Sequence, residues 1–316
     1  MVGLGMPVHN GGRYLQSTLE SILAQTYENW RLVICDNASE DDTEAICRAF
    51  AERDSRIRYV RNERNLGAHP NYNKSFNLSE GEYFKWVPHD DVLDPDYLAA
   101  CIGPLLSDPG IVICQSHLLY IDADDAVIGA YDSCLIGSDA DSPGRRFASL
   151  VLRRHPCYEV MGVFRRSLLI DSMLLENFHG ADRSLLAEMA LRGRFAQAPQ
   201  PLLLVRDHLE RYTRSHKHPA QRARWHDNSF RGRITLPVWR LYGEYIKMLW
   251  RNPMTPGARL SCHLTLVVWW TRNWNAAQML VDLVSVAIPG FVSWAERFKQ
   301  RFIAPAPGAD EVRRSS

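Results

Sequence analysis

The sequence lacks the glycine-rich signatures that identify many nucleotide-binding enzymes. No GxGxxG follows the first apolar stretch, and no GxxxxGK[ST] occurs in the 316 residues. These glycines let a backbone approach a diphosphate, so their absence removes the main support for a dinucleotide dehydrogenase or a P-loop enzyme. Excess charge is also absent, with 37 Lys and Arg against 36 Asp and Glu. A net charge of +1 argues against a nucleic-acid-binding protein.

Paired cysteines and long apolar runs are missing as well. The seven cysteines include no CxxC pair, and most lie in apolar stretches. We therefore expect reduced core residues in a cytoplasmic protein, with neither a disulfide framework nor a zinc site. No basic-then-apolar leader precedes Met6, so secretion is not expected. Because Arg272, Asn273, Asp282 and Pro289 interrupt the longest apolar run, a bilayer-spanning helix is not expected either.

Short apolar stretches, typical of buried strands, alternate with helix-period stretches from residue 2 to about 115. The expected strands are VGLGMPV, WRLVICD, RIRYVRN, GEYFKWVP and GIVICQS. One expected helix runs from Glu40 to Arg53 behind a capping box of Ser39 and Asp42, and Asp94 is expected to cap another that starts at Pro95. The alternation predicts an α/β fold with a mainly parallel sheet and helices on both faces.

Polar clusters follow three of the expected strands, at Pro7–Asn10, Asp36–Ser39 and His89–Asp91. Ligands of such sheets bind beyond the carboxyl ends of the strands, so the convergence indicates a binding site. Each cluster also has a simpler interpretation, as turn chemistry or as solvated loop acids. The adjacent Asp90 and Asp91 also suit a divalent cation bound together with a phosphate.

Four segments carry a family resemblance: MPVHNGGRYLQSTLESILAQTY, WRLVICDNASEDDT, RNLGAHPNYNKSFNLSEGEYFKWVP and HDDVLDPDYL. In order and spacing they resemble the nucleotide-sugar half of a family 2 glycosyltransferase with the GT-A fold. Residues 158–208 are similar to the acceptor half of that family. The resemblance implies a Rossmann-like sheet, a nucleotide diphosphate sugar donor, a divalent Mn²⁺ or Mg²⁺ ion and inversion at the anomeric carbon.

The resemblance also implies roles for particular residues. The elbow after the first strand, Pro7–Asn10, would hold the uracil or ribose. The Asp36 carboxylate would accept a hydrogen bond from the base imide. Asp90 would lie near the ribose or sugar and Asp91 would bind the metal, with His208 as a further candidate ligand. The implied donor-binding residues are Pro7, Val8, His9, Asn10, Asp36, Asn65, Gly67, Asn73 and Asp90.

Two positions depart from the usual family pattern. The acidic triplet begins with His89, which leaves substrate contact and loop packing both open for this side chain. Asp182, in HGADRSLLAEMALRG, matches the position of the general base, although Ala181 stands where the family usually has Glu. The alternative for Asp182 is a helix-capping role. Glu188, almost two turns further along, is expected at the surface.

The expected organisation has a nucleotide-sugar half (1–115), an acceptor half (116–215), a Trp-rich helical extension (216–303) and a disordered tail (304–316). We expect the extension to be either an amphipathic element at a membrane surface, or a helical cap or dimer contact. Residues 206–233 carry eight Lys and Arg against three acids, and form either a flap over the diphosphate or a solvated connector. The expected location is cytoplasmic, or peripheral at the inner face of the membrane.

The expected function is metal-dependent inverting transfer of a sugar from a nucleotide diphosphate sugar, with UDP as the expected nucleotide. The acceptor would be a hydroxyl of a saccharide or lipid-linked molecule, in cell-surface polysaccharide or glycolipid synthesis. The alternative is a non-catalytic nucleotide-sugar-binding protein on the same scaffold, and the role of Asp182 separates the two. A nucleotidyltransferase is disfavoured because no glycine-rich basic loop follows the first strand.

Overall fold

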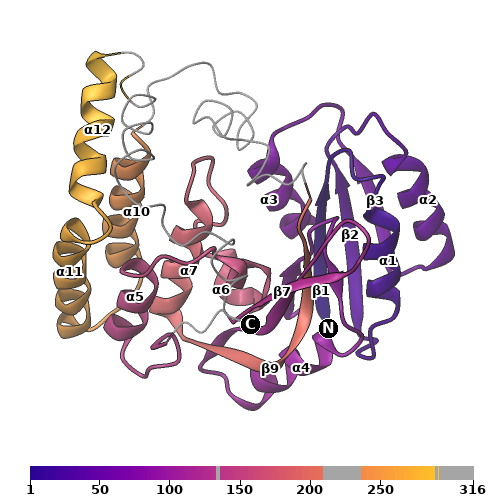
Figure 1. Cartoon of the computed structure of the whole chain (residues 1–316). Helices are drawn as coiled ribbons and strands as arrows, with labels where there is room; N and C mark the ends of the chain where they lie inside the picture. Colours follow the sequence, from indigo (N-terminus) through magenta and orange to yellow (C-terminus); the bar gives the residue numbers. More distant parts are fainter. Residues whose placement is uncertain (133–135, 209–235, 289–290, 292–316) are drawn as a thin grey trace.

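A computed structural model describes residues 1–132, 136–208, 236–288 and 291. A nine-stranded sheet forms its centre, with helices on both faces (Figure 1). The strands are β1 (Val2–Val8), β2 (Trp30–Asp36), β3 (Ile57–Arg61), β4 (Tyr83–Trp86), β5 (Val92–Leu93), β6 (Ile111–Ile121), β7 (Val127–Tyr131), β8 (Val163–Arg165) and β9 (Arg194–Arg206). The helices are α1 (Leu15–Leu23), α2 (Thr43–Arg53), α3 (Ala68–Leu78), α4 (Tyr97–Ser107), α5 (Pro143–Val151), α6 (Arg166–Ile170), α7 (Ala181–Arg192), α10 (Pro237–Arg251), α11 (Pro256–Thr271) and α12 (Asn275–Ala287), with a 3-10 turn η1 (Tyr158–Met161).

The strand order is β3-β2-β1-β4-β8-β6-β9-β5, with β7 on β6. The four strands β3, β2, β1 and β4 are parallel, as the alternating sequence pattern predicts. Beyond β4 the sheet is mixed: β8 is antiparallel to β4 and β6, whereas β9 is parallel to β6 and antiparallel to β5. This topology returns the chain to the sheet edge where the N-terminal strands end.

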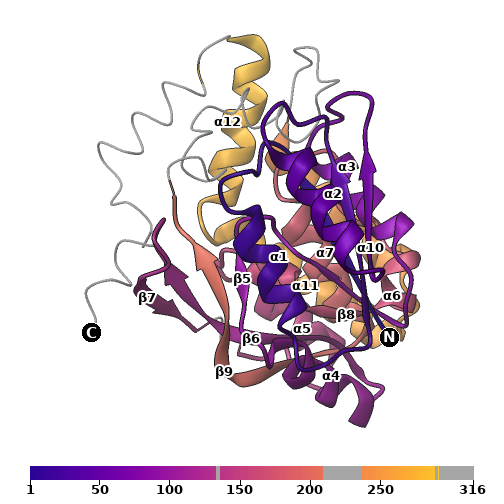
Figure 2. The same ribbon diagram turned by 90° about the vertical axis from the view of Figure 1, so that its right-hand side faces the viewer.

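Successive side chains along the strands point to opposite faces of the sheet and pack into two cores, one on each face. In β4, Phe84 and Trp86 point into a core shared with α3, α5 and α7, while Tyr83 and the following Val87 point into a core shared with α1, α2 and α4. Figure 2 shows α1 and α2 in front of the sheet, with the C-terminal helices behind it. The six described cysteines are free and buried, as expected.

Two helix starts differ from the predicted ones. The capping box is wrong: α2 begins at Thr43, and its N-cap residue Asp42 makes no side-chain capping bond. Ser39 instead donates its hydroxyl to Asp36, so it belongs to the turn before the helix. α4 begins at Tyr97 because Asp94 accepts the Asp96 amide in a turn that precedes the helix.

The C-terminal helices pack against the acceptor half. Tyr245, Met248 and Leu249 of α10 and Cys262 and Trp269 of α11 join the core of α5 and α7. A helical cap is therefore one role of this region. None of the helices in the described ranges combines the length and apolar character needed to cross a bilayer. The basic stretch 209–233 and the predicted tail 304–316 lie outside the described residues.

Candidate active site

The elbow after β1 is fixed against the turn after β2. The Asn10 amide donates to the Ser39 hydroxyl at 2.9 Å, and the Asn10 side-chain oxygen accepts the Glu40 amide at 2.9 Å. Gly11 adds a third link, donating its amide to the Thr43 hydroxyl at 2.9 Å. Pro7 and Val8 are buried in β1, whereas His9 and Asn10 are exposed at the elbow. Asn10 and His9 therefore stand at the sheet edge where a donor base is expected.

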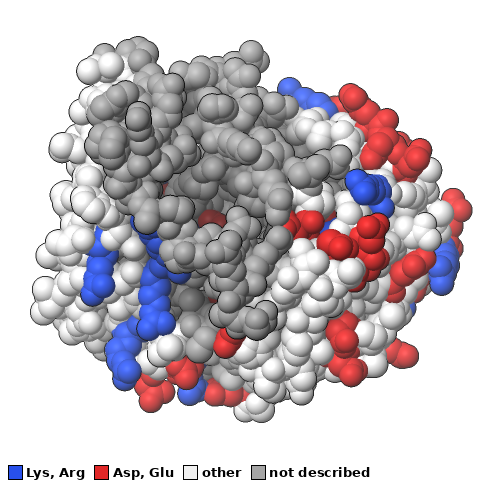
Figure 3. Space-filling model, in the orientation of Figure 1, with Lys and Arg blue, Asp and Glu red and all other residues white. Residues whose placement is uncertain are grey.

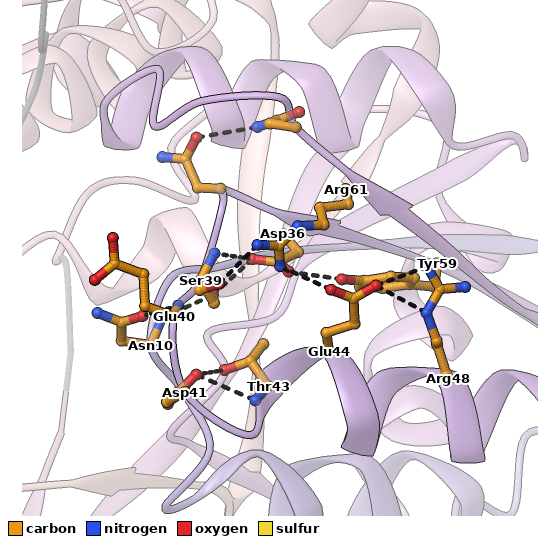
Figure 4. Close-up of polar contacts among 12 residues, drawn as sticks. Asn10, Asp36, Ser39, Glu40, Asp41, Thr43, Glu44, Arg48, Tyr59 and Arg61 are labelled. Carbon is orange, nitrogen blue, oxygen red and sulfur yellow. Dashed lines mark hydrogen bonds and ion pairs between the residues drawn. The ribbon is translucent and has the colours of Figure 1, made fainter.

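Asp36 ends β2 inside a set of four donors, which Figure 4 shows converging on its carboxylate. One oxygen accepts the Ser39 amide at 2.9 Å and the Ser39 hydroxyl at 2.6 Å. The other accepts the Tyr59 hydroxyl at 2.6 Å and the Arg61 guanidinium at 2.8 Å. Burial raises the pKa of the Tyr59 hydroxyl well above its ordinary value, and the Asp36 charge raises it further. The carboxylate thus holds the β2 turn and Arg61 in place.

Asn37 joins the second cluster to the segment before α3. Its amide nitrogen donates to Asn65 at 2.9 Å and to the Gly67 carbonyl at 3.1 Å, and its side-chain oxygen accepts the Leu66 amide at 2.8 Å. Gly67 has a φ of 94°, which explains why a glycine stands there. Asn65 and Gly67 are thereby held beside the end of β2.

Asn73 faces a different partner. Its amide donates to the Leu175 carbonyl at 2.9 Å and accepts the Leu175 amide at 3.1 Å. Close by, a ring nitrogen of His69 lies 2.6 Å from the Glu176 carbonyl. These contacts fasten α3 of the nucleotide-sugar half to the segment that leads into α7. The structure therefore places Asn73 at the junction of the two halves.

Asp90 and Asp91, the acidic pair after β4, lie against the end of β9. A ring nitrogen of His208 lies 2.9 Å from an Asp90 carboxylate oxygen, and both side chains are largely buried. One Asp91 oxygen accepts the Arg206 amide at 3.1 Å, and the Arg206 side chain donates to the Asp90 carbonyl at 3.0 Å. Two residues predicted from sequence segments more than a hundred positions apart, Asp90 and His208, are thus in direct contact.

Sequence reasoning missed Thr18 and Arg206, which position this pair. The Thr18 hydroxyl lies 2.9 Å from the His89 carbonyl and 2.8 Å from the Asp91 carbonyl. A threonine on the buried, apolar face of α1 was the available signal for such a contact. Arg206 is 1% exposed and lies over the Tyr14 ring, 4.6 Å from its centroid.

His89 is placed by the elbow. Its ring occupies the space beside Gly11 that a larger side chain at position 11 would need. Loop packing is therefore one role of His89.

Asp90, Asp91 and His208 offer the oxygen and nitrogen ligands that Mn²⁺ and Mg²⁺ accept. Among the described residues, no group of three or more His, Cys, Asp or Glu side chains could by itself hold a metal ion. Magnesium, however, is commonly held by one or two carboxylates together with substrate phosphates and water. The pair after β4 fits an ion of that kind, which the donor diphosphate would complete.

Asp182 is the second residue of α7, whose first turn follows Gly180 in a left-handed conformation with a φ of 100°. The carboxylate accepts the Arg183 amide at 2.8 Å. It also lies beside the Cys157 thiol, whose pKa is raised well above its ordinary value by burial and further by the Asp182 charge. Within the described part of the chain, Asp182 shares no hydrogen bond or ion pair with Asp90, Asp91 or His208.

The expectation that Glu188 lies at the surface is wrong. Its side chain is fully buried, and its two oxygens accept from Arg192 at 2.7 Å and from Arg251 at 2.8 Å. It also accepts the Asn252 side chain and the Met173 amide. A glutamate on the inner side of α7 is tolerated because these cations surround it. Arg192 lies one turn further along α7, whereas Arg251 comes from α10, which a short window of sequence does not reveal.

Comparison with known proteins identifies the family. The model of the family "Glycosyl transferase family 2" matches residues 4–171. The chain belongs to glycosyltransferase family 2. The resemblance found in the sequence is thereby confirmed, and with it membership of a family of transferase enzymes. The match covers more than half of the chain and ends before Asp182 and His208.

Individual relatives in family 2 are more distant. The glycosyltransferase GlyG of Streptococcus pneumoniae is 28% identical over 124 residues, which is 39% of this chain and 41% of GlyG. An uncharacterized glycosyltransferase of Rickettsia prowazekii is 34% identical over 130 residues, 38% of this chain and 40% of that protein. The chain thus matches less than half the length of either relative.

Solved structures are similar to this protein over a larger share of the chain. Staphylococcus aureus TarS (residues 1–349, with UDP-GlcNAc) superimposes with a TM-score of 0.60 at 13% identity, over 85% of this chain and 72% of that one. The mannosyltransferase PcManGT from Pyrobaculum calidifontis, with GDP-Man and Mn²⁺, gives 0.53 at 17% identity, over 99% and 83%. At these identities the similarity concerns the fold, and it confirms the predicted GT-A class.

Proposed function

We propose that this family 2 protein transfers a sugar from a UDP-sugar to an acceptor hydroxyl, with a divalent ion and with inversion at the anomeric carbon. The observation that carries the proposal is the contact of Asp90 with His208 beside Asp91, at the edge where β1, β2 and β4 end. The UDP-GlcNAc bound to TarS supports a UDP-sugar, and the Mn²⁺ in PcManGT supports a divalent ion.

Asp91, with Asp90 or His208, would hold the ion against the donor diphosphate. A divalent ion, when bound, offsets the negative charge that the diphosphate gains as it leaves. The Thr18 and Arg206 contacts keep the acidic pair in position before substrate arrives, so little reorganisation is needed during transfer. His9 and Asn10 of the elbow would contact the nucleotide, next to the segment that Asn37 holds.

Asp182 would remove the proton of the attacking hydroxyl. It stands in the acceptor half, at the start of a helix, and its contacts with the Arg183 amide and the Cys157 thiol orient the carboxylate. A base of this kind acts in the ionised form, so transfer should fall as the carboxylate is protonated at low pH. We also propose the division into a nucleotide-sugar half (1–115) and an acceptor half (116–215).

The test begins with the donor. A thermal-shift screen of UDP-sugars and GDP-sugars with Mn²⁺ identifies the nucleotide sugar that stabilises the protein. Transfer to a panel of saccharide and lipid-linked acceptors is then measured as release of the nucleotide. Asp182→Asn should reduce turnover by about a hundredfold or more while donor binding is retained. Asp96→Asn, an acid at the start of α4, serves as the matched control and should be near wild type.

Stereochemistry gives an independent check. A UDP-α-sugar should yield a β-linked product, because a base and a leaving group on opposite faces of the sugar invert its anomeric carbon. An α-linked product, or near-normal turnover of Asp182→Asn, would assign Asp182 a capping role. Donor binding without turnover with any acceptor in wild-type protein would favour the non-catalytic binding protein.

A further inference from the structure

An open surface cavity of about 510 Å³ lies between α5 and the corner that joins α11 to α12. Arg145, Arg153 and Arg272 line it, together with Ser149, Leu152 and Ile136. Among the residues that the structure describes, none that lines the cavity is acidic. Within the described ranges, the guanidinium groups of Arg145, Arg153 and Arg272 form no hydrogen bond or ion pair. Three uncompensated arginines around one cavity suit an anionic group such as a phosphate.

The corner beside this cavity is held by hydrogen bonds to the end of α5. Asn273 and Trp274 both have left-handed backbones, with φ of 52° and 60°. Asn273 donates its side-chain amide to the Leu152 carbonyl and accepts from Arg154, each at 3.4 Å, and it accepts the Gln278 side chain at 2.9 Å. The corner is thereby tied to the end of α5, and it leaves the Trp274 side chain 64% exposed next to Arg272.

The outer faces of α11 and α12 continue from this corner as an apolar surface. On α11, Leu260, Leu264 and Val267 follow helical spacing and are each about 60% exposed. The opposite side of the same helix is buried in the core. On α12, Leu280 and Leu283 are 59% and 48% exposed. Apolar surface of this extent marks an interaction site in a protein that exposes it.

We propose that this C-terminal face, which comprises the arginine cavity, Trp274 and the outer sides of α11 and α12, docks on an anionic phospholipid surface. A lipid phosphate would occupy the cavity while Trp274 and the apolar side chains enter the interface. Tryptophan, arginine and an apolar helix face in one surface are the combination that favours the headgroup zone. The proposal does not depend on the transfer reaction.

Charge distinguishes a lipid surface from a second copy of the chain. A two-fold dimer through this face would bring the same patch of both copies together, and therefore six arginines and no acid from the described lining of the two cavities. An anionic leaflet instead supplies the compensating charge. On the face drawn in Figure 3, Lys and Arg atoms gather toward the C-terminal helices, and most Asp and Glu atoms lie over the nucleotide-sugar half. That asymmetry would also orient the C-terminal end toward an anionic surface.

The test uses the full chain and cosedimentation with vesicles of phosphatidylcholine, alone or mixed with phosphatidylglycerol. Wild-type protein should bind the mixed vesicles and release them as salt is raised. The triple variant Arg145→Gln, Arg153→Gln, Arg272→Gln should lose about a hundredfold in partitioning, at about fivefold per arginine. The control Arg31→Gln, Arg53→Gln, Arg58→Gln removes the same charge from exposed positions of the nucleotide-sugar half and should lose less than about threefold.

A second pair of variants tests the apolar part. Leu264→Gln with Val267→Gln should weaken binding by about tenfold or more, whereas Leu106→Gln with Val127→Gln, at equally exposed positions elsewhere, should not. Equal vesicle binding by the arginine variant and its control would overturn the proposal. So would thermal stabilisation by inorganic phosphate without vesicle binding, which assigns the cavity to free phosphate. A dimer in sedimentation that Leu264→Gln with Val267→Gln dissolves, with no vesicle binding, would assign the face to a second copy.

Discussion

Replacing Asp36 by Asn tests how the end of β2 is built. The substitution keeps the shape of the side chain and turns one acceptor into an NH₂ group. Whichever way the amide lies, the NH₂ meets a donor: the Ser39 amide on one side, or Tyr59 and Arg61 on the other. The Tyr59 bond to a buried carboxylate contributes about 1.5–3 kcal/mol. The Arg61 pair adds little to this, because Arg61 is 35% exposed and solvent screens the pair.

We therefore expect Asp36→Asn to lower the free energy of unfolding by about 1.5–3 kcal/mol. Urea unfolding followed by tryptophan fluorescence measures this loss. Asp54→Asn is the matched control, since its carboxylate pairs with Arg56 across a more exposed turn and should lose less than about 1 kcal/mol. Equal losses in the two variants would refute the view that the four donors depend on the Asp36 charge.

The same variant tests the donor site. Ser39, which Asp36 holds, in turn accepts the Asn10 amide of the elbow. Calorimetric titration with UDP should show a loss of about 1–3 kcal/mol in Asp36→Asn and in Asp36→Ala, whether the carboxylate contacts the base or only fixes the elbow. Unchanged affinity for UDP in folded protein would remove Asp36 from the donor site.

Three further outcomes are expected. Glu188→Ala should cost about 2–3 kcal/mol in urea unfolding, because it removes the buried acceptor of Arg192, Asn252 and the Met173 amide, while the 37%-exposed Arg251 adds little; a loss under about 1 kcal/mol would contradict the buried ion-pair assignment. Burial lowers the pKa of Lys85 to about 8, below its ordinary value. The buried charge therefore lowers the free energy of unfolding by its full amount below pH 8, and by less as the pH rises toward 10.5. The stability of Lys85→Met relative to wild type should therefore decline between pH 8 and pH 10, and a difference independent of pH would contradict it. Asp91→Asn should make UDP binding insensitive to Mn²⁺ in calorimetry, whereas full metal dependence in this variant would exclude Asp91 as a ligand.

The N-terminal strands were predictable because buried parallel strands leave a continuous apolar record in the sequence. β1 and β2 have the predicted limits, and the polar clusters after them do meet at one edge. Helix starts were less accessible, because the Ser39 side chain serves a tertiary contact with Asp36 and not the cap that its spacing suggests. Local sequence does not distinguish between two acceptors that compete for one hydroxyl.

Contacts that join distant segments could not be derived from spacing. The sequence around Glu188 does not predict its ion pair with Arg251, which lies 63 positions away on α10. His208 was singled out as a candidate ligand from the family resemblance and not from periodicity. Its contact with Asp90 was not predicted, since β9 comes back to β5 only in the folded sheet. Asn73 lies in a motif that resembles the donor site of the family, but its side chain binds Leu175 at the junction of the two halves.

The return of β9 to the acidic pair also limits how such enzymes can be recombined. The stretch that the family model recognises stops at residue 171, yet two of the residues that hold the loop after β4, Arg206 and His208, lie beyond it. A chimera that exchanges this stretch alone would join the acidic loop of one parent to the residues that hold it in another. A crossover point placed after residue 208 keeps both in the same parental block, and is the junction at which grafted donor specificity should survive.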